Sequence, residues 1–92
     1  MYKDNRPCVK ENDLDKAVKL VVKAISSRVE KHGDKAFFSN HHGLGIITEE
    51  YWELVEASRT GGVNFAREAL DVAIACIWQL ASINAWERDH ET

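Results

Sequence analysis

The segment from Asn64 to Glu87 is the strongest constraint on how this 92-residue chain can fold. Asn64 can cap a helix, and the helix after it is apolar on nearly every side. Its apolar positions are Phe65, Ala69, Val72, Ala73, Cys76, Ile77, Leu80, Ile83 and Ala85. A helix without a polar stripe is buried on several sides. A small three-helix domain cannot surround it, so we expect this helix also to pack against another chain.

The first predicted helix is amphipathic. Its apolar residues recur at helical spacing and are Leu14, Val18, Val21, Ile25 and Val29. We expect the helix to begin after a cap at Asn12 and to stop at His32-Gly33. Residues 1–11 are polar, contain the only proline and show no period, which predicts a flexible tail. The single domain then spans residues 12–92.

A second helix follows a polar connector. It is predicted to begin between His42 and Thr48 and to end near Arg59, before the Gly61-Gly62 pair. The short connection between the second and third helices makes them antiparallel neighbours. No segment has the apolar alternation of a strand. The expected fold class is therefore all-α, an antiparallel helical bundle completed by oligomerisation.

Charge and hydropathy limit the partners and the compartment. The net charge is −3, and phosphate backbones and anionic lipid attract clustered cations, so duplex nucleic acid is not an expected partner. The chain does not open with a secretory signal, and its longest apolar-rich stretch, Ala69 to Ala81, is shorter than the roughly 20 residues of a bilayer span. Cys8 and Cys76 have no neighbour at metal or redox spacing. We expect a cytoplasmic protein without a membrane segment.

Four acidic residues form two pairs on the second and third helices. Glu50 and Glu53 are three residues apart, as are Glu68 and Asp71, so each pair projects from one side of its helix. Antiparallel packing would bring these four carboxylates together, where they repel unless they take up protons or cations. Hard oxygen ligands favour Mg²⁺ or Mn²⁺. One interpretation of the pattern is therefore a metal site.

The acids also have a purely structural interpretation. Thr48 could cap the second helix, which would place Glu49 and Glu50 in a first turn where the helix dipole favours acids. Glu68 could play the same part four residues after Asn64. Asp71 fits this account poorly, because it lies in the most apolar helix, where an unpaired buried charge is costly. The spacing alone leaves both interpretations open.

The order of these residues matches a known pattern. Glu49-Glu50-Tyr51-Trp52-Glu53 followed by Glu68-Ala69-Leu70-Asp71 resembles the EExxE and ExxD motifs of the MazG-like, all-α nucleoside triphosphate pyrophosphohydrolases. The resemblance covers roughly residues 40–84, about half of the chain. It implies a homodimer or homotetramer that uses Mg²⁺, or Mn²⁺, to convert a nucleoside triphosphate to a monophosphate and pyrophosphate, with a house-cleaning role in the nucleotide pool.

The resemblance also implies roles for single residues. By position, the metal ligands would be Glu50, Glu53, Glu68 and Asp71, and the catalytic residues would be Glu49, which orients the attacking water, and Glu53. Phosphate-binding cations are expected from outside the motifs. The candidates are Lys16, Lys19, Lys23 and Arg28 of the first helix, with Arg59 and Arg67.

Aromatic residues supply the remaining candidates. A pocket for the base could be lined by Phe37, Phe38, His41 and His42 of the connector. Trp52 and Trp78 are instead expected to anchor the core or an interface. The alternative function is a catalytically silent helical module that binds nucleotide or a protein partner.

Overall fold

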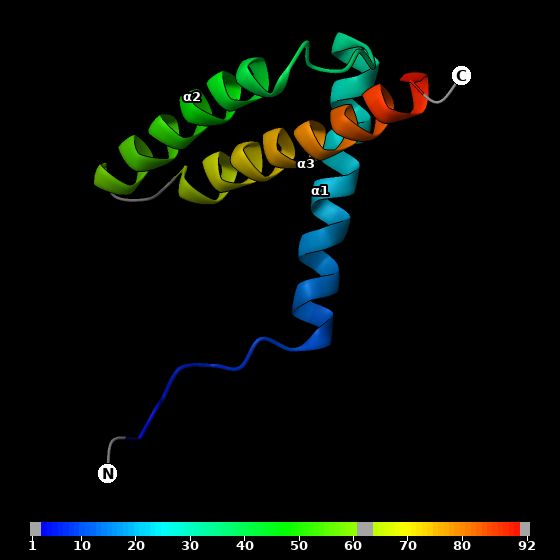
Figure 1. Cartoon of the computed structure of the whole chain (residues 1–92). Helices are drawn as coiled ribbons and strands as arrows, with labels where there is room; N and C mark the ends of the chain where they lie inside the picture. The colour runs from blue at the N-terminus through cyan, green and yellow to red at the C-terminus, as the bar shows by residue number, and fades with distance from the viewer. Residues whose placement is uncertain (1–2, 61–63, 91–92) are drawn as a thin grey trace.

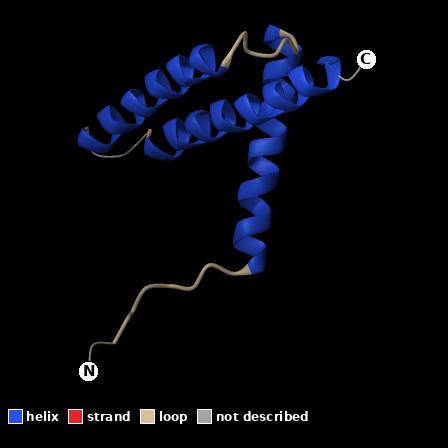
Figure 2. Cartoon of the chain, viewed as in Figure 1, coloured by secondary structure: helices blue, strands red, loops and turns tan. Residues whose placement is uncertain are grey.

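Three α-helices make up most of the part of the chain that the structure describes. The structure is a computed structural model, and it describes residues 3–60 and 64–90. Within them lie α1 (Glu11–His32), α2 (Asn40–Arg59) and α3 (Phe65–His90), and no strand (Figure 2). α2 and α3 run antiparallel side by side, and α1 crosses α3 (Figure 1). The predicted all-α class and the antiparallel α2–α3 pair are confirmed.

α1 begins earlier than expected and ends where expected. Lys10, not Asn12, occupies the cap position, and its backbone N–H donates to the Asp13 carboxylate at 2.9 Å. An acid three residues into a helix can satisfy the cap residue in this way, so Asn12 is not needed as a cap. At the other end, Gly33 has a φ of +87° and donates its N–H to the Val29 carbonyl at 2.9 Å. Glycine reaches this φ without steric cost, which explains the stop.

α2 also begins before its predicted window. The Ser39 hydroxyl accepts the His42 N–H at 3.1 Å and caps a helix that starts at Asn40. Thr48 therefore lies well inside α2, where its hydroxyl donates to the Leu44 carbonyl at 2.7 Å. Glu49 and Glu50 are more than two turns from the start of the helix. Their interpretation as capping acids is wrong.

The connector between α1 and α2 is held along α3 by side chains one turn apart. Ser82, only 2% exposed, accepts the Phe37 N–H at 2.9 Å and donates to the Trp78 carbonyl at 2.8 Å. The Trp78 indole N–H donates to the Lys35 carbonyl at 3.0 Å. The Trp86 indole N–H donates to the Phe37 carbonyl, also at 3.0 Å. These bonds satisfy connector backbone groups that leave water on folding.

Gly43 lets the start of α2 approach α3 closely. A Cβ atom at Gly43 would lie 1.5 Å from the Gln79 Oε1 atom, so a larger residue there would displace the Gln79 amide. Gln79 also donates its amide N–H to the Asn40 Oδ1 atom at 2.8 Å. Glu50 lies seven residues after Gly43, on the same face of α2, and is therefore directed toward α3.

A single chain is extended, so the predicted bundle is loosely packed. Its dimensions are 59 × 30 × 29 Å, and its radius of gyration is 16.5 Å. A compact chain of this length would have a radius of gyration of about 12 Å. The N-terminal half of α1 projects away from α2 and α3 (Figure 1), and Leu14 and Val18 on it are 59% and 52% exposed.

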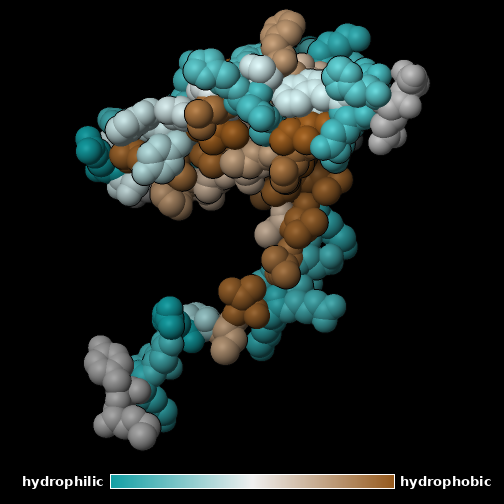
Figure 3. Space-filling view, in the orientation of Figure 1, coloured by the Kyte–Doolittle hydropathy of each residue, from teal (hydrophilic) through white to brown (hydrophobic). Residues whose placement is uncertain are grey.

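α3 is not covered on several sides by its own chain. Its buried residues are Ile74, Ala75 and Ser82, whereas Leu80 is 63% exposed. Hydrophobic side chains lie over α3 and continue along the projecting half of α1 (Figure 3). Trp52 of α2 is 61% exposed, so it is not a core anchor within one chain. α3 would therefore be buried on several sides, as expected, only if another chain packs against it.

The exposed apolar surface of α3 has a second possible explanation, because the helix is apolar enough to cross a membrane. Among the described residues, α3 has the length and composition of a membrane-crossing helix. Core helices of soluble proteins share this composition. Glu68 and Asp71 of α3 lie against acids of α2, which suits a helix packed on protein. The absence of a membrane segment stays a prediction.

We predict that the chain forms a homodimer or homotetramer through α3 and the projecting half of α1. A monomer would expose a contiguous apolar surface that includes Leu14, Val18, Ile77 and Leu80. Light scattering at micromolar concentration measures the mass directly. A mass of 10.4 kDa, that of one chain, would contradict the prediction.

We also predict that Ser82→Ala destabilises the protein. The change leaves the Phe37 N–H without its partner in a part-buried position, which costs about 1–3 kcal/mol. The free energy of unfolding in urea measures the loss. Ser58→Ala, an exposed serine of α2, is the matched control and should change stability little. Equal effects of the two substitutions would show that the connector does not depend on Ser82.

Candidate metal centre

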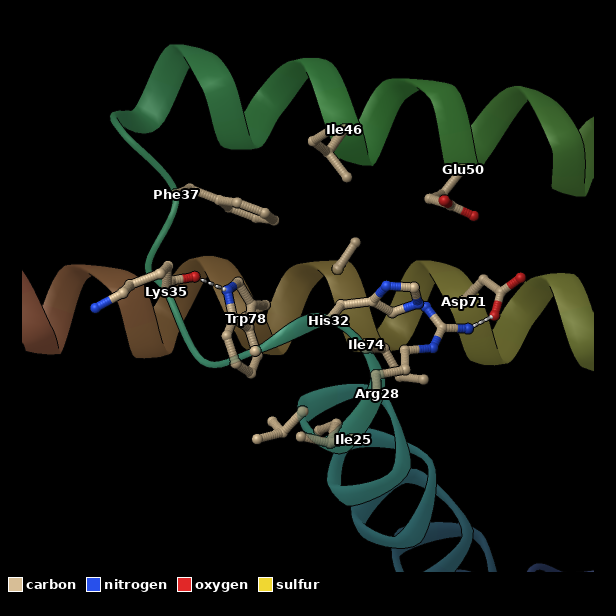
Figure 4. A pocket seen from close by; sticks show the side chains of 13 residues that line it. Ile25, Arg28, His32, Lys35, Phe37, Ile46, Glu50, Asp71, Ile74 and Trp78 are labelled. Atoms are coloured by element: carbon tan, nitrogen blue, oxygen red, sulfur yellow. Dashed lines mark hydrogen bonds and ion pairs between the residues drawn. The ribbon is translucent and has the colours of Figure 1, made fainter.

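Two antiparallel helices bring four carboxylates to one place. Glu50 and Glu53 come from α2, and Glu68 and Asp71 from α3. One oxygen of each lies within 4.8 Å of the others. We call these four residues the acidic cluster. Glu50 and Asp71 face one another across the two helices in Figure 4. The convergence predicted from the three-residue spacing is confirmed.

Burial and mutual repulsion act on Glu50. Its pKa is raised, first by burial and then by the charges of Glu53 and Asp71, with a smaller contribution from Glu68. Arg28 opposes this shift by favouring the ionised form. Buried carboxylates that repel one another gain stability from a proton or a cation.

Two buried oxygens of the acidic cluster have no hydrogen-bond partner. They are the Oε2 atoms of Glu50 and Glu68. Buried polar atoms are normally paired, and an unpaired carboxylate oxygen is a natural cation ligand. The donor set consists only of carboxylate oxygens, the chemistry that Mg²⁺ and Mn²⁺ prefer. The acidic cluster therefore fits a hard divalent cation.

Helix capping explains one member of the acidic cluster in part. Glu68 lies in the first turn of α3, and its N–H donates to the Asn64 carbonyl at 3.0 Å, as expected after a cap residue. The helix dipole favours an acid there. The same side chain also reaches Glu50, Glu53 and Asp71, a proximity that capping does not require.

Arg28 is the basic residue that α1 brings to the acidic cluster. Its guanidinium donates to the Asp71 Oδ1 atom and forms an ion pair that joins α1 to α3 (Figure 4). The Asp71 side chain is 18% exposed, so this charge is largely removed from water. The pairing explains how an aspartate is accommodated in the most apolar helix.

A cavity of about 260 Å³ adjoins the acidic cluster. Glu50 and Asp71 form one part of its wall, and Phe37 and Trp78 lie toward the other end (Figure 4). Further apolar side chains come from Ile25, Val29, Ile46 and Ile74, and the basic side chains from Arg28, His32 and Lys35. The cavity thus joins acidic, apolar and basic surfaces contributed by all three helices and the connector.

The other predicted site residues lie apart from this cavity. Glu49 is exposed and outside the acidic cluster. Lys16, Lys19 and Lys23 lie exposed on α1, where Lys19 pairs with Asp15 at 3.0 Å. Arg67 is exposed at the start of α3 and does not line the cavity. One chain does not bring these cations to the acids.

The connector supplies fewer pocket residues than predicted. Phe37 lines the cavity, but Phe38 is 92% exposed. His42 lies 5.1 and 5.4 Å, centroid to centroid, from the Phe37 and Phe38 rings, and its Nδ1 atom accepts the Phe38 N–H at 3.0 Å. His42 therefore orders the start of α2. His41 is exposed.

Sequence reasoning missed three residues of the cavity wall. His32, Lys35 and Trp78 line it, and Trp78 had been expected only as an anchor. His32 lies at helical spacing from Ile25 and Val29, a signal that was visible in the sequence. Lys35 belongs to the connector, and no local pattern marks it.

Comparisons with known proteins identify no relative. No protein-family model, curated protein or solved structure matches the chain. The chain is therefore a small three-helix all-α protein with an acidic cluster that could bind a metal ion.

We predict that Mn²⁺ or Mg²⁺ stabilises the folded chain through the acidic cluster. A cation at 100 times its dissociation constant would add about 2.7 kcal/mol. For a domain of this size, the melting temperature would rise on the order of 10 °C or more. Glu50→Gln should lose most of this rise, because it removes a carboxylate whose Oε2 atom has no protein partner. Differential scanning calorimetry with and without metal gives the shift.

Glu49→Gln is the matched control for Glu50→Gln. It removes the same charge from the neighbouring residue but leaves the acidic cluster intact, so the metal-induced shift should remain. Without metal at neutral pH, Glu50→Gln should melt above the wild type because it relieves repulsion. This difference should disappear as the pH falls through the raised pKa of Glu50, where the wild-type carboxyl also becomes neutral. Melting curves that do not respond to either metal would contradict the site.

Proposed function

We propose that the chain is a Mg²⁺-dependent nucleoside triphosphate pyrophosphohydrolase of the MazG-like kind. The observation that carries the proposal is the convergence of Glu50, Glu53, Glu68 and Asp71 from two antiparallel helices beside a cavity. These are the positions at which the chain resembles the EExxE and ExxD motifs. The capping account of Glu49 and Glu50, which competed with a metal site, does not hold for α2.

The buried and exposed acids of the acidic cluster suit different roles. Glu50, Glu68 and Asp71 are partly buried and held by two packed helices, so they would hold the cation. A bound divalent cation acidifies an attacking water and neutralises charge on the triphosphate. Glu53 is exposed and can accept the proton of that water and pass it to solvent. Glu49, exposed beside it, is the candidate for orienting the water.

The cavity suits the nucleoside part of such a substrate. Its apolar wall contains Phe37 and Trp78, whose rings can pack on a flat base. Arg28 lies between this wall and the acids, where a phosphate chain would pass. Lys16, Lys19, Lys23 and Arg67 would reach a phosphate only from a second copy of the chain.

The expected reaction is the conversion of at least one nucleoside triphosphate to monophosphate and pyrophosphate in the presence of Mg²⁺. Glu53→Gln should abolish turnover, because it removes the proton acceptor. Asp71→Asn should abolish it by weakening the metal site. The matched control is Glu56→Gln, an exposed acid of α2 outside the acidic cluster, which should retain activity. Pyrophosphate release over a panel of nucleoside triphosphates is the assay.

Three results separate this function from its alternative. Release of orthophosphate and a nucleoside diphosphate would indicate a different reaction. Metal-induced stabilisation without turnover of any nucleotide would favour the catalytically silent binding module. Turnover that Glu53→Gln and Asp71→Asn leave intact would place the active site elsewhere.

A further inference from the structure

Arg28 occupies a position that a cation at the acidic cluster would contest. Its guanidinium donates to the Oδ1 atom of Asp71, and it lowers the repulsion felt by Glu50. Within residues 3–60 and 64–90, this ion pair is the one that joins a basic side chain to the acidic cluster. The single positive charge of Arg28 cannot neutralise four carboxylates. The acidic cluster therefore keeps a net negative charge that attracts a further cation.

The two partners of this ion pair differ in freedom. The Asp71 side chain is 18% exposed, whereas the Arg28 side chain is 44% exposed. Arg28 also lines the cavity, together with His32 and Lys35. The arginine can therefore leave Asp71 and turn into the cavity without movement of α1, while the aspartate keeps its place in α3.

We infer that Arg28 is a built-in counter-cation that a divalent metal displaces from Asp71, and that the freed guanidinium then binds a condensed phosphate in the cavity. A divalent cation at the acidic cluster repels the guanidinium and neutralises the carboxylates in its place. The planar fork of arginine matches two oxygens of a phosphate group. Arg28 thus couples metal binding to anion binding. This inference rests on the proposed function only in requiring that the acidic cluster hold the metal.

Removal of Arg28 should change the affinities for the metal and for the anion in opposite directions. Without Arg28, the metal meets no competitor at Asp71 and binds more tightly, while the anion loses its fork and binds more weakly. A purely structural role of the ion pair would change both affinities in the same direction. If Arg28 only tethered α1 to α3, its removal would loosen the cavity wall and weaken both ligands together.

The experiment compares Arg28→Gln with Lys35→Gln in the full chain. Lys35 also lines the cavity and carries the same charge, but it has no recorded ion pair with the acidic cluster. Calorimetric titration with Mn²⁺ alone should show about 3- to 10-fold tighter binding by Arg28→Gln. Titration with pyrophosphate at saturating Mg²⁺ should show about 10-fold weaker binding. Lys35→Gln should change Mn²⁺ affinity by less than about 2-fold, since salt screens an unpaired exposed charge.

Arg28→Lys keeps the experiment decisive if Arg28→Gln folds poorly. Lysine retains the charge and the aliphatic stem but lacks the fork, so both affinities should shift in the same directions by smaller amounts. Equal or weaker Mn²⁺ binding by both Arg28 variants would overturn the inference and leave the metal site standing. Failure of the wild type and both variants to bind Mn²⁺ would overturn the inference together with the proposed metal site.

Discussion

The attachment of the connector to α3 is the interaction on which the rest of the structure depends. Trp78, Ser82 and Trp86 lie one turn apart and hold backbone groups of Lys35 and Phe37. This attachment fixes the position along α3 at which the chain passes from α1 to α2. Arg28 consequently reaches Asp71 from the α1 side of α3, and Glu50 of α2 faces α3 from the other side. The cavity exists because these three elements meet along one stretch of α3.

The negative charge of the acidic cluster must be neutralised in a molecule that is weakly packed. Carboxylates that repel one another oppose the packing of α2 on α3, and a single chain buries little apolar surface to offset that repulsion. Arg28 relieves part of the repulsion, and a divalent cation would relieve the remainder. An acid cluster of this kind is costly for stability alone, and a cation bound to it would remove that cost. The exposed apolar surfaces of α1 and α3 point to a second chain as the remaining source of stability.

Local sequence was a good guide to the helices and a poorer guide to their first residues. The apolar period located all three helices, and Gly33 ended α1 as expected. The start of α2 was missed because Ser39 and Thr48 are both good capping residues by local criteria. The choice between them depends on the connector, which the side chains of α3 hold in place from more than 40 residues away. That difference moved Glu49 and Glu50 from the first turn into the interior of α2 and removed their capping role.

The sequence by itself determined the helical class and the four acids of the candidate site, because the spacing of apolar and acidic residues along a helix is a local property. Three-residue spacing set each acidic pair on one face, and a short connection made the two helices neighbours. Only the tertiary structure decided that Arg28 is the partner of Asp71 and that Lys16, Lys19 and Lys23 do not line the cavity. It also decided that Phe37 and Trp78 share a cavity with two of the acids. These relations join residues about 40 positions apart, and they follow from the angle at which α1 crosses α3, which no local pattern encodes.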